Sequence, residues 1–284
     1  MQLVELRQAY HQEICKKIIR FKKNREGVLY PNFADAGNRS SIAIATGMVE
    51  LLGCQPASGT LAGQSTGGRF ELLTKDFLER AMASLQHLRP GDWMYSIQAN
   101  ISEFDQYEHL ASLAEIVKET DTLAAALGMD YIVKPDIVMG RQPLVDAEIN
   151  RNDLLVGEEI LVCNLSPLRV ANNPYPILHA SISCKWTLRS DRSQNARTEA
   201  LNLVRNRKGG LPHIVAVTAE PLPTRLAALA LGTGDLDCVY HFALPELQAA
   251  IAEADNQDQG DMLDTLIAGR RLRDISDLPF DLAV

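Results

Sequence analysis

The amino-acid sequence predicts an α/β fold, arranged as one domain over all 284 residues (1–284) with helical elaborations. Two observations support this prediction. The runs 213–218 and 237–242 are apolar and rich in β-branched residues, which is typical of buried parallel strands. The segments between and after these runs space their apolar residues as amphipathic helices do. The predicted helices lie near 222–231, 244–255 and 259–269.

The N-terminal part of the chain is expected to begin with a helix. Residues 3–23 have the pattern of an amphipathic helix, with apolar residues set among lysines and arginines. Residues 29–38 are rich in Pro, Gly and Asn and predict a loop. Ser40 or Ser41 is expected to cap a second helix, which runs to Leu52 and stops at Gly53.

A glycine-rich stretch comes next. Residues 59–68 predict a second loop, and 70–88 a long helix. The loop lacks the Gly-x-x-x-x-Gly-Lys-[Ser/Thr] pattern that cradles a nucleoside triphosphate, which argues against that class of site. Residues 102–127 show another helical pattern, which ends at Gly128.

The middle of the chain is expected to supply more strands. The run Lys134-Pro135-Asp136-Ile137-Val138-Met139 predicts one, and a charged connection follows at 146–153. A short strand is expected at 160–165 and a long one at 177–188. The polar residues 193–195 predict the start of a helix at 194–207.

Composition and charge narrow the function classes. The 28 basic and 36 acidic residues leave a net charge of −8, which argues mildly against a nucleic-acid partner. Basic residues are nevertheless focused, with seven between positions 185 and 208 and six, without an acid, between 14 and 25. Such segments can grip a polyanion along one face, although each could also be a solvated helix face.

The chain shows no sign of export or membrane insertion. No apolar run reaches membrane-spanning length, and the first residues lack the layout of a signal peptide. The five cysteines are scattered and never form a Cys-x-x-Cys pair, so we expect reduced thiols in a cytoplasm.

Three residues follow the pattern Pro-Asp-x48-Lys-x13-Glu: Asp136, Lys185 and Glu199. An acid at one strand end, a lysine on a neighbouring strand and an acid on the next helix suit the hydrolysis of a phosphodiester. This reaction needs a nucleophilic water and neutralised charge on the phosphate oxygens. Any Pro-Asp pair could instead be an ordinary turn.

The same residues could hold a divalent metal ion. Magnesium prefers hard oxygen ligands and takes one or two protein carboxylates. Asp136 is the best candidate for the principal ligand, and the main-chain carbonyl of Cys184 could supply a second oxygen. Lys185 would orient the water or stabilise developing charge, and Glu199 and Glu71 would hold metal-bound waters or a second metal ion.

A short polar motif falls at the expected junction of the strand 177–188 and the next helix. Arg189 and Arg192 lie on either side of Asp191. Arginine donates in a fork to guanine O6 and N7, and aspartate accepts from cytosine N4. The motif therefore predicts a reader of G·C-rich sequence, with an exposed salt-bridged turn as the alternative.

Some prominent residues are expected to be structural. His179 and His213 lie in apolar strands, and Trp186 is expected to pack in the core or an interface. Asp146 and Glu148 form a carboxylate pair that we assign to structure, because Asp136 already fills the ligand role.

These motifs resemble those of type II restriction endonucleases of the CCGG family, of type IIF, within the PD-(D/E)xK superfamily. The resemblance covers nearly the whole chain and is densest from Asp146 onwards. The residues that carry it are 179–187, 189–192, 202–209 and 274–279.

The resemblance implies a restriction-endonuclease-like core, a central mixed β-sheet flanked by helices, with the second acid displaced onto a helix. It implies a Mg²⁺-dependent enzyme, with Mn²⁺ as a substitute. The implied catalytic set is Asp136, Ser183, Lys185, Glu199 and Glu71, with Asp136, Cys184, Glu71 and Glu199 as metal ligands.

The resemblance also implies how DNA is read. Arg189, Asp191 and Arg192 would read the inner CCGG, and Asp35 and Arg225 the outer G·C pair from the major groove. Gln64 would reach the minor groove. Gly37 stands where the family has a serine, so one polar contact near the outer base pair is expected to be missing.

The implied product is a cut at G/CCGGC in duplex GCCGGC, which leaves a 5′-CCGG overhang. The implied working form is a homotetramer, a dimer of dimers that binds two DNA sites, without any membrane partner. A bacterial cytoplasmic host would pair it with a cognate DNA methyltransferase.

Two other functions stay open at this point. One is a sequence-specific DNA-binding protein or degenerate nuclease that does not cut. The other is a repair or junction nuclease that cuts by structure. The joint presence of Asp136, Lys185 and Glu199 disfavours the first, and the Arg189-to-Arg192 motif disfavours the second.

Overall fold

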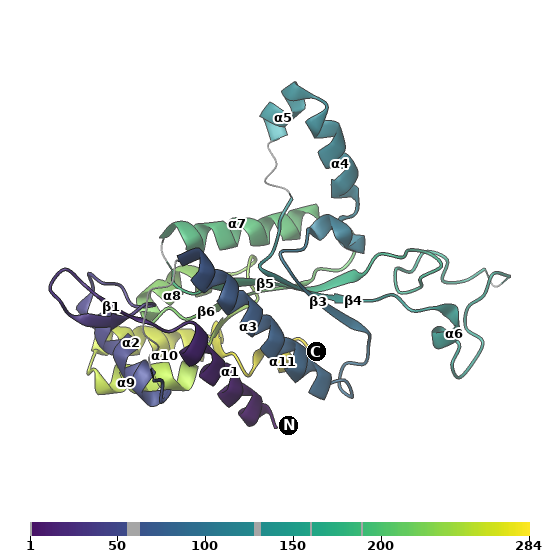
Figure 1. Cartoon of the computed structure of the whole chain (residues 1–284). Helices are drawn as coiled ribbons and strands as arrows, with labels where there is room; N and C mark the ends of the chain where they lie inside the picture. The colour runs from purple at the N-terminus through teal and green to yellow at the C-terminus, as the bar shows by residue number, and fades with distance from the viewer. Residues whose placement is uncertain (1, 56–62, 128–131, 160, 189) are drawn as a thin grey trace. The chain divides into compact units, whose positions relative to one another are not determined.

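A six-stranded mixed sheet forms the centre of the fold (Figure 1). The computed structural model describes residues 2–55, 63–127, 132–159, 161–188 and 190–284. The strand order is β3-β4-β5-β6-β7-β8. Strand β3 pairs with β4 in antiparallel fashion, whereas β6 with β7 and β7 with β8 pair in parallel. The α/β prediction is confirmed, and the sheet is mixed as expected.

The strands of this sheet are short. Their bounds are β3 Trp93–Ile97, β4 Ile137–Arg141, β5 Ile177–Lys185, β6 His213–Thr218, β7 Cys238–His241 and β8 Leu272–Asp274. The buried runs at 213–218 and 237–242 are strands as predicted, because their β-branched and apolar side chains are covered on both faces of the sheet.

The chain divides into two compact units. Unit 1 comprises Met1–Arg89, Ile182–Ala200 and Ile214–Val284, and unit 2 comprises Pro90–Ser181 and Leu201–His213. Each unit is assembled from separate stretches of the chain, so the expectation of a single domain over 1–284 stays a prediction.

Unit 1 holds most of the helices. Helix α1 packs on α3, α2 on α9, and α8 on α10. A small antiparallel hairpin, β1 with β2, precedes α2. The bounds are α1 Leu3–Lys17, β1 Phe21–Lys23, β2 Leu29–Pro31, α2 Arg39–Leu51, α3 Gly63–Ser84, α7 Ser190–Asn206 (to residue 200), α8 Pro223–Ala230, α9 Leu244–Glu253, α10 Gln257–Ala268 and α11 Leu278–Asp281.

Trp186 lies at the centre of an aromatic cluster in unit 1. Its ring centroid is 5.2 Å from that of Phe70, 5.5 Å from Phe33 and 5.8 Å from Phe242. All four side chains are buried, so the cluster anchors the chain directly after β5. The prediction that Trp186 packs in the core is confirmed.

Two further contacts tie α1 to the rest of unit 1. The Arg7 guanidinium donates to both carboxylate oxygens of Asp274, at 2.9 Å each, and to those of Glu246. This cation between two carboxylates holds the pKa of each acid below its usual range, against the opposing effect of burial.

Unit 2 surrounds β3 and β4 with short helices. These are η1 Ile101–Glu103, η2 Asp105–Tyr107, α4 His109–Lys118, α5 Asp121–Leu127 and α6 Asp146–Ile149. Buried Gln106 ties this region together, since its side-chain amide donates to Leu178 O and accepts from Leu178 N–H, both at 2.8 Å. A methyl group at Gly140 would lie 2.8 Å from the Phe104 ring, so β4 requires glycine there.

The connection 142–176 in unit 2 extends far from β4 and carries α6 (Figure 1). The short strand expected at 160–165 is wrong for 161–165, which form turns and bends. Leu161 and Leu165 are 86% and 95% exposed, so no packing surface holds them in a strand. Asp146 accepts two hydrogen bonds from Arg169, and Glu148 pairs with Arg151, so both acids have partners within unit 2.

Several predicted boundaries are wrong at the N-terminus. Helix α1 ends at Lys17 instead of 23, because the Arg20 guanidinium turns back and donates to Lys16 O and Ile19 O. Residues 29–31 form β2 within the expected loop. Asn38, and neither Ser40 nor Ser41, caps α2 by accepting from Ser41 N–H at 2.9 Å.

The glycine-rich stretch also differs from its prediction. Residues 59–62 lie outside the described residues, and 63–68 already belong to α3. Buried Thr66 and Phe70 lie on one face of this helix, so packing outweighs the low helix propensity of the glycines.

Other predicted elements also differ from the structure. The pattern at 102–127 breaks into four short helices. The long strand expected at 177–188 ends at Lys185, and the helix expected from 194 starts at Ser190. Strands β3 and β8 were not predicted.

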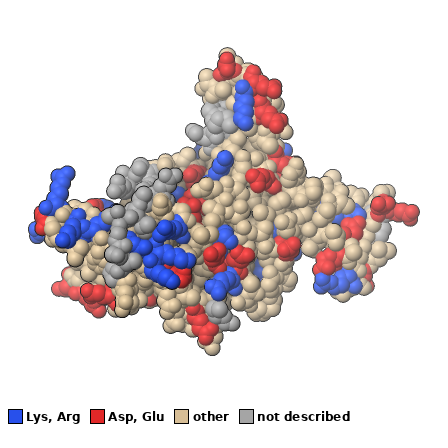
Figure 2. Space-filling model, viewed as in Figure 1, with Lys and Arg blue, Asp and Glu red and all other residues tan. Residues whose placement is uncertain are grey.

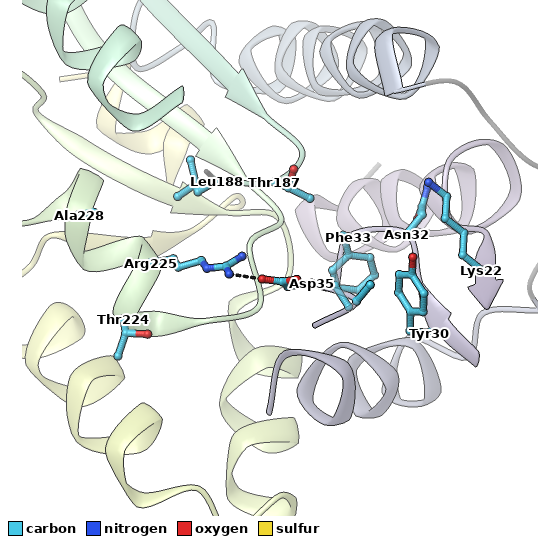
Figure 3. A pocket seen from close by; sticks show the side chains of 12 residues that line it. Lys22, Tyr30, Asn32, Phe33, Asp35, Thr187, Leu188, Thr224, Arg225 and Ala228 are labelled. Carbon is cyan, nitrogen blue, oxygen red and sulfur yellow. Dashed lines mark hydrogen bonds and ion pairs between the residues drawn. The ribbon is translucent and has the colours of Figure 1, made fainter. Parts of the chain in front are cut away.

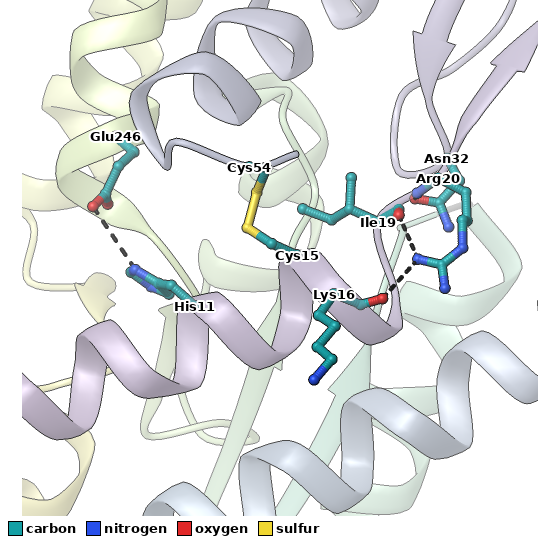
Figure 4. Close-up of a disulfide and its surroundings, with 8 residues drawn as sticks. All are labelled: His11, Cys15, Lys16, Ile19, Arg20, Asn32, Cys54 and Glu246. Carbon is teal, nitrogen blue, oxygen red and sulfur yellow. Dashed lines mark hydrogen bonds and ion pairs between the residues drawn. A yellow bond between two sulfur atoms is a disulfide. The ribbon is translucent and has the colours of Figure 1, made fainter. Parts of the chain in front are cut away.

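Two cysteines correct the expectation of reduced thiols throughout. Cys15 on α1 and Cys54 after α2 form a disulfide, with their Cα atoms 5.2 Å apart (Figure 4). The pair is 39 residues apart in the sequence and belongs to an odd set of five, which leaves no spacing signature to detect. Cys163, Cys184 and Cys238 remain thiols.

Candidate functional site

A pocket of about 670 Å³ opens in unit 1 (Figure 3). Its walls come from the β1–β2 hairpin, the loop before α2, the chain after β5 and the start of α8. Residues from distant parts of the sequence therefore meet here. The polar and charged side chains that line it include Lys22, Tyr30, Asn32, Asp35, Thr224 and Arg225.

Asp35 and Arg225 point toward each other in this pocket (Figure 3). The Arg225 Nη2 group donates to Asp35 Oδ2, although the two residues are 190 positions apart. Each side chain is 36% exposed, so the pair is held by the protein and still reachable from solvent. The structure thus brings together the two residues predicted to read the outer base pair.

The loop before α2 holds Asp35 in place. Its main-chain N–H donates to the hydroxyl of buried Ser41 at 2.9 Å, and its Oδ1 accepts from Gly37 N–H at 3.0 Å. A β-carbon at Gly37 would lie 3.7 Å from Asp35 Oδ1, an ordinary contact distance. The site therefore has room for a serine at this position.

Glu220 lies behind Arg225 and was not among the predicted site residues. It is 1% exposed, and its Oε1 lies 3.8 Å from Arg225 Nη1. Its Oε2 accepts from Leu188 N–H at 2.9 Å, and its Oε1 from Leu222 N–H at 3.4 Å. Burial raises the pKa of Glu220 to about 7. A glutamate two residues after a strand carries no sequence signal of burial, which is why it was missed.

The predicted catalytic residues of unit 1 lie on β5, α3 and α7. Ser183 and Lys185 alternate with buried Ile182 and Cys184, so they share one face of β5. The Lys185 carbonyl accepts from Ala219 N–H at 3.4 Å, which ties the end of β5 to the residue after β6.

The two glutamates differ in burial. Glu71 on α3 is 9% exposed, whereas Glu199 on α7 is half-buried. An ionised carboxylate as deeply buried as that of Glu71 is costly unless a cation or hydrogen-bond donors stabilise it.

Asp136 belongs to unit 2 and directly precedes β4. The strand predicted from Lys134 begins at Ile137, so Asp136 lies just outside it. Its carbonyl accepts from Gln98 N–H at 3.2 Å, and its side chain is half-buried. In the part of the chain that the structure describes, no three His, Cys, Asp or Glu side chains group as a metal site requires.

Four predicted DNA-reading residues fall partly or wholly outside what the structure describes. Arg189 lies outside the described residues. Asp191 and Arg192 belong to the first turn of α7, and Gln64 to that of α3, but their side chains are not described. Asp191 and Arg192 therefore lie at the start of the helix that follows β5, as predicted.

Charge is distributed unevenly over the surface. In the view of Figure 2, Lys and Arg side chains gather over the part of unit 1 that carries β1, whereas several Asp and Glu side chains lie on α4 and α5 of unit 2. A net charge of −8 therefore coexists with a focused basic region beside the pocket. Such a region attracts a polyanion by long-range electrostatics. Among the described residues, none of the helices is long and apolar enough to cross a membrane.

Comparison with known proteins gives near-complete matches. The family model described as NgoMIV restriction enzyme matches residues 10–284. The type II restriction enzyme NgoMIV of Neisseria gonorrhoeae is 49% identical over 283 residues, which cover 98% of this chain and 97% of that protein.

Solved structures of restriction endonucleases are also similar to this chain. One is a complex of the restriction endonuclease PspGI with substrate DNA, 15% identical over 99% of this chain and 92% of that one, with a TM-score of 0.37. Another is the Bse634I restriction endonuclease, 17% identical over 77% of this chain and 80% of that one, also with a TM-score of 0.37.

Proposed function

The chain belongs to the NgoMIV restriction enzyme family, and on that premise we propose that it is a type II restriction endonuclease that cleaves duplex DNA at GCCGGC. The proposed cut is G/CCGGC, which leaves a 5′-CCGG overhang. The observation that carries the sequence assignment is the pairing of Asp35 with Arg225 in the pocket of unit 1.

The chemistry of this pair matches the outer G·C base pair. An arginine presents a fork of donors that fits guanine O6 and N7 in the major groove, and an aspartate accepts from cytosine N4. Without DNA, Asp35 and Arg225 satisfy each other. With DNA, each can exchange its partner for a base of the opposite hydrogen-bonding character. The inner CCGG is assigned to Arg189, Asp191 and Arg192.

The remaining residues support phosphodiester hydrolysis. Lys185, on the same face of β5 as Ser183, would orient the attacking water and offset charge on the phosphate. The carboxylates of Asp136, Glu71 and Glu199 and the carbonyl of Cys184 are the hard-oxygen donors proposed to hold Mg²⁺, with Mn²⁺ as a substitute. Bound there, the metal ion would neutralise charge on the phosphate.

We also propose a homotetramer that binds two sites. The connection 142–176 of unit 2 exposes large apolar side chains, including Leu154 at 76%, Leu161 at 86% and Leu165 at 95%. Exposed apolar side chains concentrated on one segment favour an interface with another copy of the chain. A bacterial host would protect its own sites with a cognate methyltransferase.

Digestion of a plasmid that carries two GCCGGC sites tests this function, in Mg²⁺ and in EDTA, with run-off sequencing of the ends. We expect metal-dependent ends at G/CCGGC. Cuts at CCGG with another flanking pair would contradict the assignment of Asp35 and Arg225. Specific binding without cutting would instead identify a non-catalytic DNA-binding protein.

A further inference from the structure

Glu220 joins two parts of the pocket that are distant in the sequence. One carboxylate oxygen accepts from the main chain of Leu188, and the other lies 3.8 Å from the Arg225 guanidinium. Leu188 directly precedes Arg189, the first residue of the motif assigned to the inner CCGG. Arg225 belongs to the pair assigned to the outer G·C base pair. Glu220 therefore contacts Arg225, which is assigned to the outer base pair, and the main chain of Leu188, which directly precedes a residue assigned to the inner CCGG.

We propose that Glu220 is a positioning residue for base recognition, which holds Arg225 and the main chain at Leu188 in place. The inference rests on the proposed function, since it assumes that Arg225 reads the outer base pair.

The charges around Arg225 explain why a second carboxylate is needed. In the free protein the guanidinium lies between Asp35, which is 36% exposed, and Glu220, which is buried. When Asp35 turns to a cytosine, Arg225 loses one of its two anionic neighbours. Glu220 remains behind it, keeps the guanidinium compensated and restrains its direction. Asp35 is thus free to contact DNA while Glu220 stays in the protein.

The buried position of Glu220 favours its neutral form, and the charged side chains around it shift the equilibrium between the neutral and the ionised form. Arg225 stabilises the carboxylate, Asp35 opposes it, and burial dominates, so the pKa of Glu220 is about 7. His241, the last residue of β7, is neutral at this pH because burial lowers its pKa to about 4. A carboxyl whose pKa is raised on folding contributes stability below its unfolded pKa, and this contribution is lost as pH rises through about 7.

Removal of the charge on Glu220 should therefore weaken base recognition and raise the stability of the fold. The charged carboxylate orients Arg225 at high pH, whereas the same charge weakens the fold. Glu220→Gln keeps an acceptor for Leu188 N–H and removes the charge. A residue with only a structural role would not combine a loss of recognition with a gain of stability.

The test is a binding titration in Ca²⁺ with wild-type protein and Glu220→Gln, at pH 8, against GCCGGC and against ACCGGT. The second duplex changes only the outer base pair. We expect Glu220→Gln to bind GCCGGC about tenfold more weakly and ACCGGT nearly unchanged, within the range that one well-placed base contact contributes. We also expect its Tm at pH 8 to exceed that of the wild type. Equal losses on both duplexes, or no loss, would overturn the proposal.

Glu246→Gln is the matched control, because Glu246 also pairs with an arginine, Arg7, and lies outside the pocket. It should lower the Tm and leave the ratio of the two affinities unchanged. A second measurement needs no variant: the wild-type preference for GCCGGC should rise between pH 6 and pH 8, and a flat profile would contradict the inference. A wild-type protein that binds both duplexes equally would instead refute the proposed reading of the outer pair.

Discussion

The pocket of unit 1 and the connection 142–176 of unit 2 differ in the side chains that they present: charged and paired in the pocket, apolar and exposed in the connection. In the pocket, charged side chains are arranged against internal partners, as Arg225 is against Asp35 and Glu220. In the connection, Leu161 and Leu165 are almost fully exposed and pack against little of their own chain. The first arrangement is prepared for a polar ligand, and the second for an apolar partner. We infer that unit 1 decides which DNA is bound, whereas unit 2 supplies Asp136 and the surface for assembly.

The largest expected effect separates cleavage from recognition. Asp136→Ala should lower the cleavage rate by at least about 10³-fold, because it removes the proposed principal metal ligand. Specific binding to GCCGGC in Ca²⁺ should remain measurable. Rapid-quench cleavage and a gel-shift titration measure the two properties. Asp105→Ala, another acid of unit 2, is the control, and a mutant at Asp136 that still cuts would show the metal assignment to be wrong.

Arg225→Ala should have the next largest effect, which concerns the recognition of DNA and not its cleavage. Loss of a forked contact to guanine should weaken binding to GCCGGC by about 5- to 150-fold and reduce the preference over ACCGGT. Competition binding in Ca²⁺ measures this preference. Arg273→Ala is the control, since Arg273 is also 36% exposed and pairs with Asp281. An unchanged preference in Arg225→Ala would contradict the proposal that the pocket of unit 1 reads the outer base pair.

The double variant Leu161→Asp with Leu165→Asp tests the assembly surface of unit 2. Two charges placed on the proposed interface should shift the protein to a smaller oligomer and slow cleavage of a two-site plasmid by about tenfold, with the preference for GCCGGC unchanged. Size-exclusion chromatography with light scattering gives the mass. Leu51→Asp places a charge on an exposed leucine of unit 1 and should leave the oligomer intact. A tetramer that persists in the double variant would locate the interface elsewhere.

The smallest expected effect concerns Gly37. Serine fits at this position, since its β-carbon would keep an ordinary distance from Asp35, and its hydroxyl adds one donor near the outer base pair. One added neutral hydrogen bond should raise the preference for GCCGGC by about two- to fivefold. The same competition titration would detect this change. A lower preference in Gly37→Ser would mean that the loop at Asp35 must move when DNA binds.

The parts of the fold that could be predicted are those that local sequence patterns specify. Strand β6 has the predicted bounds, because its central residues 214–217 are apolar and buried, as a strand covered on both faces requires. Strand β3 escaped prediction because all five of its residues are half-buried and no clear alternation results. The disulfide of Cys15 with Cys54 depends on how α1 and α2 pack, which spacing does not reveal.

The candidate site shows the same division. The spacing of Asp136, Lys185 and Glu199 suggested a nuclease, whereas Asp35 and Arg225 entered only through family resemblance. No local pattern links two residues 190 positions apart, and only the fold brings them into one pocket. Glu220 required the structure itself, because its importance lies in its burial and in its contact with Leu188.

The most direct test of the division between the units is one competition titration in Ca²⁺ of wild type, Asp136→Ala and Arg225→Ala, against GCCGGC and ACCGGT. We predict that Asp136→Ala keeps the wild-type ratio of affinities, while Arg225→Ala brings that ratio close to one. A ratio that falls in Asp136→Ala, or survives in Arg225→Ala, would contradict the assignment of recognition to unit 1.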